Sequence, residues 1–119
     1  MFQTVLREVV EGTEGAIASL VMDRDGIALE SYTQPGVAHD IRAAGVELGM
    51  VLRSAQNAAE MLSAGKAEEL TIVAESHTML VRVVDENYFV ALSLLPGGNL
   101  GKARYLLRVR VPDLATLLA

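Results

Sequence analysis

Two stretches of the sequence are apolar on both faces of an extended chain. They are residues 16–23 (AIASLVMD) and 88–95 (YFVALSLL). Successive side chains of a strand point to opposite faces of its sheet, so a strand of this kind must be covered on both sides. The two stretches therefore predict central strands of a sheet that carries helices on both faces.

Three further strands are expected beside this pair. Residues 27–32 follow the turn Arg24-Asp25-Gly26, and residues 70–76 and 78–85 carry more polar side chains than the central pair. The links within each run of strands are too short for anything but antiparallel hairpins. With the doubly buried strands side by side at the centre, the strand order, counted along the chain, is 2-1-5-4-3.

Helical patterns fill the rest of the chain. A short helix begins at Phe2 and stops near Gly12, a long one runs through residues 38–64, and a third begins at Asn99 and ends at Pro112. Three leucines after the proline are expected to dock as a separate final turn: Leu114, Leu117 and Leu118. The element order predicts an α+β fold, a three-layer α/β/α sandwich around a five-stranded antiparallel sheet, with residues 1–119 as one domain.

The long helix has one broad face of small and apolar residues, which we expect to be buried. Its members are Ile41, Ala44, Gly45, Leu48, Val51, Leu52, Ala55, Ala58, Ala59 and Leu62. Glycine costs roughly 1 kcal/mol against alanine inside a helix, so Gly45 and Gly49 indicate a packing requirement. Close approach of a sheet or of a twin helix would explain both glycines.

The opposite side of the long helix mixes charge with apolar groups. Val46, Met50 and Met61 stand among polar residues, namely Arg42, Glu47, Arg53, Asn57 and Glu60. Scattered apolar residues are normal on a protein surface. Apolar residues rimmed by polar ones also mark protein-binding sites, and both interpretations remain open.

Composition excludes several classes of function. The net charge of −5 argues against a nucleic-acid partner, and the absence of cysteine excludes disulfides and thiol catalysis. No run of about 18 apolar residues and no signal-peptide pattern occurs, so we expect a cytoplasmic protein without membrane insertion.

No motif for catalysis, a metal or a cofactor is complete. Residues 97–102 (GGNLGK) resemble a phosphate loop, but Pro96 stands where its first glycine belongs and Ala103 replaces its hydroxyl residue. His39 and His77 lack metal-ligand spacing and are expected to be solvated. We therefore expect no catalytic residue, no metal and no cofactor.

The last predicted helix carries a run of basic residues, Lys102, Arg104, Arg108 and Arg110, whereas Glu8, Glu11 and Glu14 lie near the N-terminus. If both helices pack on one face of the sheet, these charges pair. Ion pairing is favoured over a lipid-binding patch.

Two local sequence features add to the evidence from chain length and element order. An apolar strand ends in Asp23-Arg24-Asp25-Gly26 before a hairpin, and Asn99-Leu100-Gly101-Lys102-Ala103-Arg104 begins the last helix. Together with length and element order, they resemble the roadblock/dynein light-chain superfamily over essentially the whole chain. The resemblance implies a single roadblock-type domain of profilin-like topology.

The resemblance further implies a non-enzymatic homodimer in which the long helices of two subunits pair and the third strands join the sheets. Bacterial and archaeal members typically associate with Ras-like small GTPases, and a prokaryotic regulator is the function it favours. A scaffold subunit of a motor or signalling complex and a small-molecule sensor remain alternatives.

Two sets of site residues follow from the helical geometry and the resemblance. The predicted dimer interface consists of Gly45, Leu48, Gly49, Leu52, Ala59, Thr71 and Val73. The predicted partner-binding surface consists of Arg42, Val46, Met50, Arg53, Asn57 and Met61.

Overall fold

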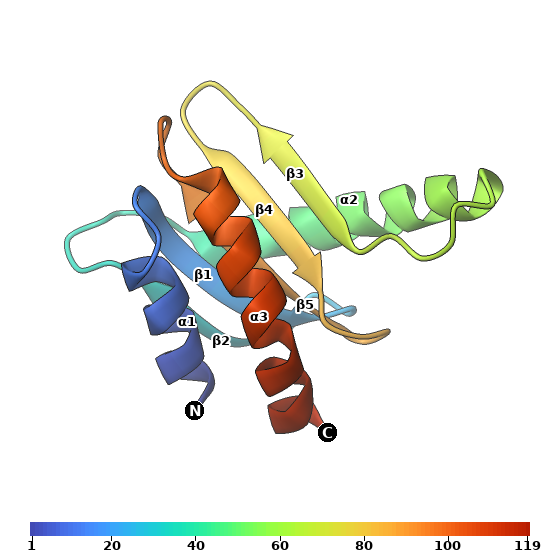
Figure 1. Ribbon diagram of the computed structural model, residues 1–119, viewed down its shortest axis with the longest axis horizontal. Helices are drawn as coiled ribbons and strands as arrows, with labels where there is room; N and C mark the ends of the chain where they lie inside the picture. Colours follow the sequence, from blue (N-terminus) through green and yellow to red (C-terminus); the bar gives the residue numbers. More distant parts are fainter.

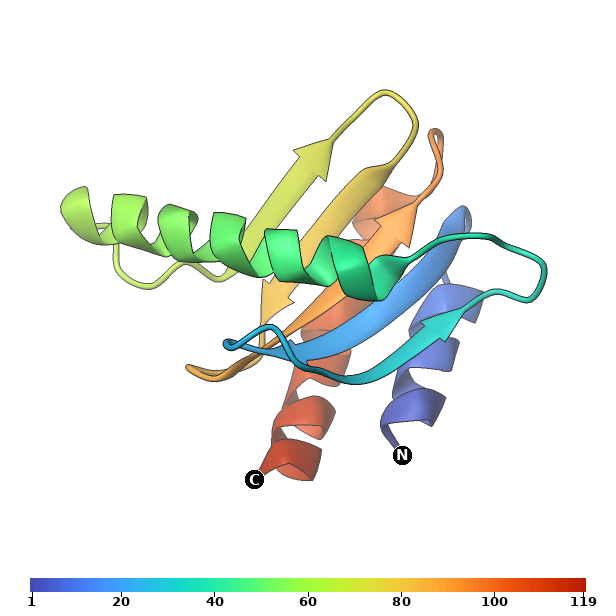
Figure 2. The same ribbon diagram turned by 180° about the vertical axis from the view of Figure 1, so that it is seen from behind.

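The computed structural model describes residues 1–119. In chain order its elements are α1 (Phe2–Glu11), β1 (Ala16–Asp23), β2 (Ala28–Thr33), α2 (Ile41–Met61), β3 (Glu69–Val73), β4 (Thr78–Val83), β5 (Tyr88–Leu94) and α3 (Leu100–Leu118). The strands form one antiparallel sheet in the order β2-β1-β5-β4-β3, as predicted. Helices α1 and α3 cover one face and α2 crosses the other (Figures 1 and 2), which confirms the three-layer α/β/α sandwich.

The central strands β1 and β5 supply core residues to both faces of the sheet. One cluster packs against α1 and α3: Val5, Leu6, Val9, Val10, Ala16, Val21, Leu80, Val90, Leu92, Leu94, Ala103, Leu107 and Leu114. The other packs against α2: Ile17, Ala18, Leu20, Met22, Ile41, Leu48, Leu52, Val81, Phe89 and Ala91. Ser19, a polar residue within β1, is buried at no cost in hydrogen bonding because its Oγ donates to the carbonyl of Leu6 at 3.1 Å.

Aspartate side chains shape two of the hairpin turns. Asp23 Oδ1 accepts from the backbone N–H groups of Asp25 and Ile27, at 2.9 and 3.0 Å. Gly26 completes this turn with a φ of 85°, a conformation that favours glycine. Between β4 and β5, Asp85 Oδ1 likewise accepts from the N–H groups of Asn87 and Tyr88. Both turns therefore follow from local side-chain chemistry.

Helix α3 continues through Pro112, so the prediction that this proline ends the helix is wrong. Proline lacks an N–H and removes one helical hydrogen bond, here to the carbonyl of Arg108. Pro112 and Arg108 are both exposed, so water can reach that carbonyl. Beyond the proline, Leu114 is buried in the core. Its burial stabilises the last turns and offsets the missing bond.

Helix α2 is only partly covered by the sheet, so the predicted broad buried face is wrong in extent. Its N-terminal half packs on the sheet through residues one helical stripe apart, Ile41, Gly45, Leu48 and Leu52. Its C-terminal half extends beyond the sheet past β3 (Figures 1 and 2). As a result Val51 is 41% exposed and Leu62 is 79% exposed, although both belong to the predicted buried face.

The basic residues of α3 pair with acids, but with two different elements. Arg110 binds Glu8 of α1 as well as Asp113, whereas Arg104 binds Glu69 of β3 at 3.1 Å. The hydrogen bond that Arg110 donates to the Glu8 carboxylate raises the pKa of Arg110 above its ordinary value. The predicted pairing between α3 and α1 thus holds for Arg110 alone, while Lys102 and Arg108 form no ion pair.

Candidate protein interface on helix α2

The outer side of α2 presents apolar side chains to solvent. Asp40 caps the helix by accepting from the N–H of Ala43 at 3.1 Å, which fixes where the helix begins. From this start the 3.6-residue period turns Val46, Met50 and Met61 away from the sheet, with exposed fractions of 39%, 56% and 87%. These three residues are the apolar part of the predicted partner-binding surface.

Two of the three polar residues of that surface are held by contacts with the β1–β2 region. Arg42 Nε donates to Ser31 Oγ at 3.0 Å, and its guanidinium lies 3.9 Å from Glu30. Arg53 Nη2 donates to the carbonyl oxygen of Arg24 at 3.1 Å, across the gap between α2 and the β1–β2 turn. Both arginines are thereby oriented beside the exposed apolar residues.

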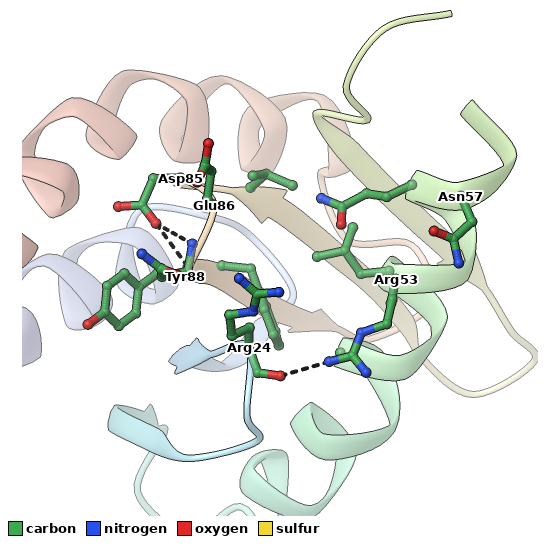
Figure 3. Close-up of a pocket in the computed structure, with 12 residues that line it drawn as sticks. Arg24, Arg53, Asn57, Asp85, Glu86 and Tyr88 are labelled. Carbon is green, nitrogen blue, oxygen red and sulfur yellow. Dashed lines mark hydrogen bonds between the residues drawn. The ribbon is translucent and has the colours of Figure 1, made fainter. Parts of the chain in front are cut away.

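A pocket of about 230 Å³ opens beside this surface, between α2 and the β1–β2 and β4–β5 turns (Figure 3). Arg24, Arg53 and Asn57 line it together with Asp85 and Glu86 of the β4–β5 turn and Tyr88 at the start of β5. Its other lining residues are Gly49, Leu52, Gln56, Val83, Asn87 and Phe89. Sequence reasoning missed this pocket, since only the fold brings the two turns to one flank of α2.

The residues predicted to form a dimer interface lie in three different environments. Gly45, Leu48 and Leu52 are buried within the subunit, where they pack on its own sheet. Gly49 lines the pocket, beside the ring of Phe89. The remaining three lie nearer the surface: Ala59 and Thr71 are half-buried and Val73 is 73% exposed.

A second stripe on α2 faces solvent without a partner inside the subunit. It consists of Val51, Ala55, Ala58 and Leu62, which recur at the spacing of one helical face. This stripe is an apolar surface that the single chain leaves uncovered. Val73, at the end of the edge strand β3, is also exposed, but it lies on the α3 face of the sheet, because Thr71 two residues before it bonds Arg104 of α3.

His39 and His77 are not simply solvated, so that prediction is wrong. The loop before α2 and the β3–β4 turn bring their rings together, with centroids 5.1 Å apart and planes 27° apart. His39 Nε2 is buried without a hydrogen-bond partner. Burial lowers the pKa of His39, the neighbouring His77 lowers it further, and Asp40 acts in the opposite direction.

Two further findings limit the chemistry of the surface. No group of three or more histidine, aspartate or glutamate side chains lies close enough together to hold a metal ion. No helix is long and apolar enough to cross a membrane.

The fold and this surface together define a three-layer domain of the roadblock type, in which α2 alone crosses one face of the sheet and exposes a group of apolar side chains. Comparison with solved structures agrees. MglC from Myxococcus xanthus is 38% identical, with 97% of each chain covered and a TM-score of 0.70. The gliding protein MglB from Thermus thermophilus is 21% identical, with 95% of this chain and 84% of that chain covered and a TM-score of 0.85. A Roadblock/LC7 domain from Streptomyces avermitilis is 11% identical, with 98% and 96% covered and a TM-score of 0.86.

The chain belongs to the roadblock/dynein light-chain family, on the prokaryotic branch that includes MglB and MglC. The resemblance inferred from the sequence is thus confirmed. Comparison with protein-family models and with curated proteins gives no match.

Proposed function

We propose that this protein is a homodimeric, non-enzymatic interaction module that binds a Ras-like small GTPase through the outer side of α2. The observation that carries the proposal is the exposure of Val46 and Met50 beside Arg42, Arg53 and Asn57. An apolar centre with a polar, arginine-bearing rim is the usual anatomy of a transient protein interface.

The uncovered stripe of α2 supports self-association. Val51, Ala58 and Leu62 are exposed on the half of α2 that extends beyond the sheet, and Val73 is exposed on the neighbouring edge strand β3. A second copy of the chain, related by a twofold axis, would cover both α2 and the β3 edge with the same surface. We therefore assign the stripe, with Ala59, Thr71 and Val73, to the proposed dimer interface.

Sedimentation equilibrium tests the dimer. We expect the wild type to be dimeric at about 100 μM and Leu62→Glu to reduce the dimer fraction, because a charge would be buried in the interface. Tyr105→Glu is the matched control, since Tyr105 is similarly exposed but lies on α3, on the opposite face of the sheet. A wild type that is monomeric at this concentration contradicts the proposed dimer.

Titration calorimetry tests the GTPase surface. The probe is a Ras-like small GTPase of the organism that encodes this chain, in its triphosphate-bound and diphosphate-bound forms. Met50→Asp places a charge at the centre of the surface, and a loss of about 2 kcal/mol, roughly thirtyfold in affinity, is expected if Met50 is a hot spot.

The same variant should keep its fold. Met50 is 56% exposed, and exposed substitutions usually change the free energy of unfolding by no more than about 0.5 kcal/mol. Tyr105→Asp again serves as the control that should leave affinity unchanged. Unaltered affinity of Met50→Asp would move the partner site away from α2.

Regulation and scaffolding differ in what the bound GTPase does. A regulator changes the rate of nucleotide exchange or hydrolysis by the GTPase, whereas a scaffold leaves both rates unchanged while binding. Rates measured with saturating wild-type protein, and again with Met50→Asp, separate these two functions. The small-molecule sensor is less well supported. The pocket beside α2, at about 230 Å³, is smaller than the roughly 300–1,000 Å³ of typical ligand sites. The larger hollow of about 1070 Å³ between α2, the β4–β5 turn and α3 is lined mainly by polar and charged residues, whereas ligand sites are mostly apolar.

A further inference from the structure

Two arginines beside the α2 pocket have no carboxylate partner. Five others form ion pairs within the subunit: Arg7, Arg42, Arg82, Arg104 and Arg110. Arg24 and Arg53 form none, although the chain carries 15 acidic residues against 10 basic ones. In an acidic protein, two unpaired arginines at one pocket are a local exception to the overall charge.

The acids that line the same pocket are already engaged. Asp85 Oδ1 accepts two backbone N–H groups of its own turn, at 2.8 and 3.0 Å. Glu86 pairs with Lys66 at 3.7 Å. No carboxylate of the subunit forms an ion pair with Arg24 or Arg53, and Asp85, although bonded within its turn, keeps its negative charge at the same pocket.

The two arginines approach the pocket from different elements (Figure 3). Arg53 projects from α2, and Arg24 belongs to the β1–β2 turn. The bond from Arg53 to the carbonyl of Arg24 uses one of the five N–H donors of its guanidinium and holds the side chain in place. The other donors of Arg53 remain free for a planar acceptor such as a carboxylate, which arginine recognises well.

The rest of the pocket suits the stem of one side chain. Gly49 has no side chain, and it leaves space next to Leu52 and to the ring of Phe89, both of which are buried. These groups form an apolar floor beneath the polar rim. The volume of about 230 Å³ is below that of typical metabolite sites, whereas anchor residues of protein interfaces commonly fill small pockets.

We propose that this pocket binds an aspartate or glutamate side chain of the protein partner, with its carboxylate between Arg24 and Arg53 and its stem against Leu52 and Phe89. The inference rests on the proposed function, because the pocket shares Arg53 and Asn57 with the proposed partner-binding surface. It adds the chemistry of the contact, and it adds Arg24, Gly49 and Phe89 to the site.

Charge-removing variants test the contact with the GTPase used above. Arg24→Gln and Arg53→Gln should each reduce affinity about tenfold, the usual scale of a charge-assisted hydrogen bond. Arg24→Gln keeps the main-chain carbonyl that Arg53 binds, so it removes charge without releasing the turn. Arg108→Gln is the matched control, because Arg108 is exposed and unpaired but lies on α3. Equal losses for all three variants would show a nonspecific charge effect and overturn the proposal.

Failure of this inference is distinguishable from failure of the proposed function. If Met50→Asp abolishes binding while Arg24→Gln and Arg53→Gln bind like wild type, the surface stands and the carboxylate pocket is refuted. If the proposal is correct, Arg53→Glu binds weakly, and replacing one acidic residue of the GTPase by arginine restores its affinity. If no acidic residue of the GTPase gives such rescue, the proposed contact is wrong.

A probe that needs no partner tests the pocket directly. N-acetylglutamate methylamide is titrated into ¹⁵N-labelled protein, and the signals of the Gly49 amide and the Arg53 Nε–H are followed. We expect saturable shifts that disappear in Arg53→Gln and are absent with N-acetylglutamine methylamide, the neutral analogue. Inorganic phosphate forms the third arm. Stronger shifts with phosphate, or equal shifts with the neutral analogue, would contradict carboxylate recognition.

Discussion

Gly45 of α2 lies directly over Leu20 of β1: a Cβ atom added to Gly45 would stand 2.3 Å from Leu20 Cδ2. The same atom would stand 2.8 Å from Met22 Cε. Both side chains are fully buried, so they have little room to move aside. The close approach indicated by this glycine is therefore an approach of α2 to the sheet of its own subunit.

Comparing Gly45→Ala with Gly49→Ala isolates this contact. Both variants gain helix propensity, about 1 kcal/mol. At Gly49 a Cβ would meet only the Phe89 ring at an ordinary 3.5 Å, so Gly49→Ala should raise the free energy of unfolding. Gly45→Ala also incurs overpacking, typically 1–3 kcal/mol, and should be less stable than Gly49→Ala by about that amount. Urea denaturation measures the difference, and equal values would disprove the close packing.

Replacing Pro112 by alanine should stabilise the subunit. A proline inside a helix costs about 3 kcal/mol relative to alanine, while its restriction of the unfolded chain returns about 0.4–1 kcal/mol. Because α3 already runs through this position, Pro112→Ala should raise the free energy of unfolding by roughly 2–2.5 kcal/mol. Thermal and chemical unfolding experiments both measure this increase in stability. A destabilised Pro112→Ala would mean that a proline-induced bend is needed for Leu114 to reach the core.

The bond between Arg110 and Glu8 should couple α3 to α1. Arg110 is about three-quarters buried and also binds Asp113 at 2.9 Å, so the pair is better ordered than a free surface ion pair. A double-mutant cycle of Arg110→Ala and Glu8→Ala should give a coupling energy of about 0.5–1 kcal/mol. The coupling should fall at high salt, because part of the interaction remains exposed. Strict additivity of the two substitutions would argue that the bond contributes nothing.

The stacked histidines predict a loss of stability at mildly acidic pH. The folded state lowers the pKa of His39 below its ordinary value of about 6.5, so the unfolded chain binds the proton more readily. Stability from this group is fully present above about pH 6.5 and is lost as the pH falls through 6.5 toward the lowered pKa of the folded state. Chemical denaturation between pH 7.5 and 5 should show this loss in the wild type.

Two histidine variants test whether His39 is the group that causes this pH dependence of stability. His39→Asn removes the titrating ring and should flatten the dependence between pH 6.5 and 5. His77→Asn removes one of the two causes of the lowered pKa, and should move the pKa of His39 toward its ordinary value in an NMR titration. A wild-type pKa at or above 6.5 would refute the prediction.

The sheet could be predicted from the sequence because its determinants are local or periodic. Residues 16–23 and 88–95 are apolar on both faces, and this alone places β1 and β5 at the centre. Asp23, Gly26 and Asp85 specify their turns through bonds that span only a few residues. Short links then leave antiparallel pairing as the only solution, so the strand order follows.

Only the tertiary structure decided which side chains of α2 and α3 are buried and which are exposed to a partner. A helical period gives the direction of a side chain around its axis, but it does not say how far along the helix the sheet reaches. Leu52 and Leu62 therefore share a predicted face, yet one is buried and the other is exposed. The stacking of His39 on His77 and the meeting of Arg24 with Arg53 join segments far apart in the chain. Such contacts have no local signal, because only the packing of α2 across the sheet brings the loop before it and the turns beside it within reach.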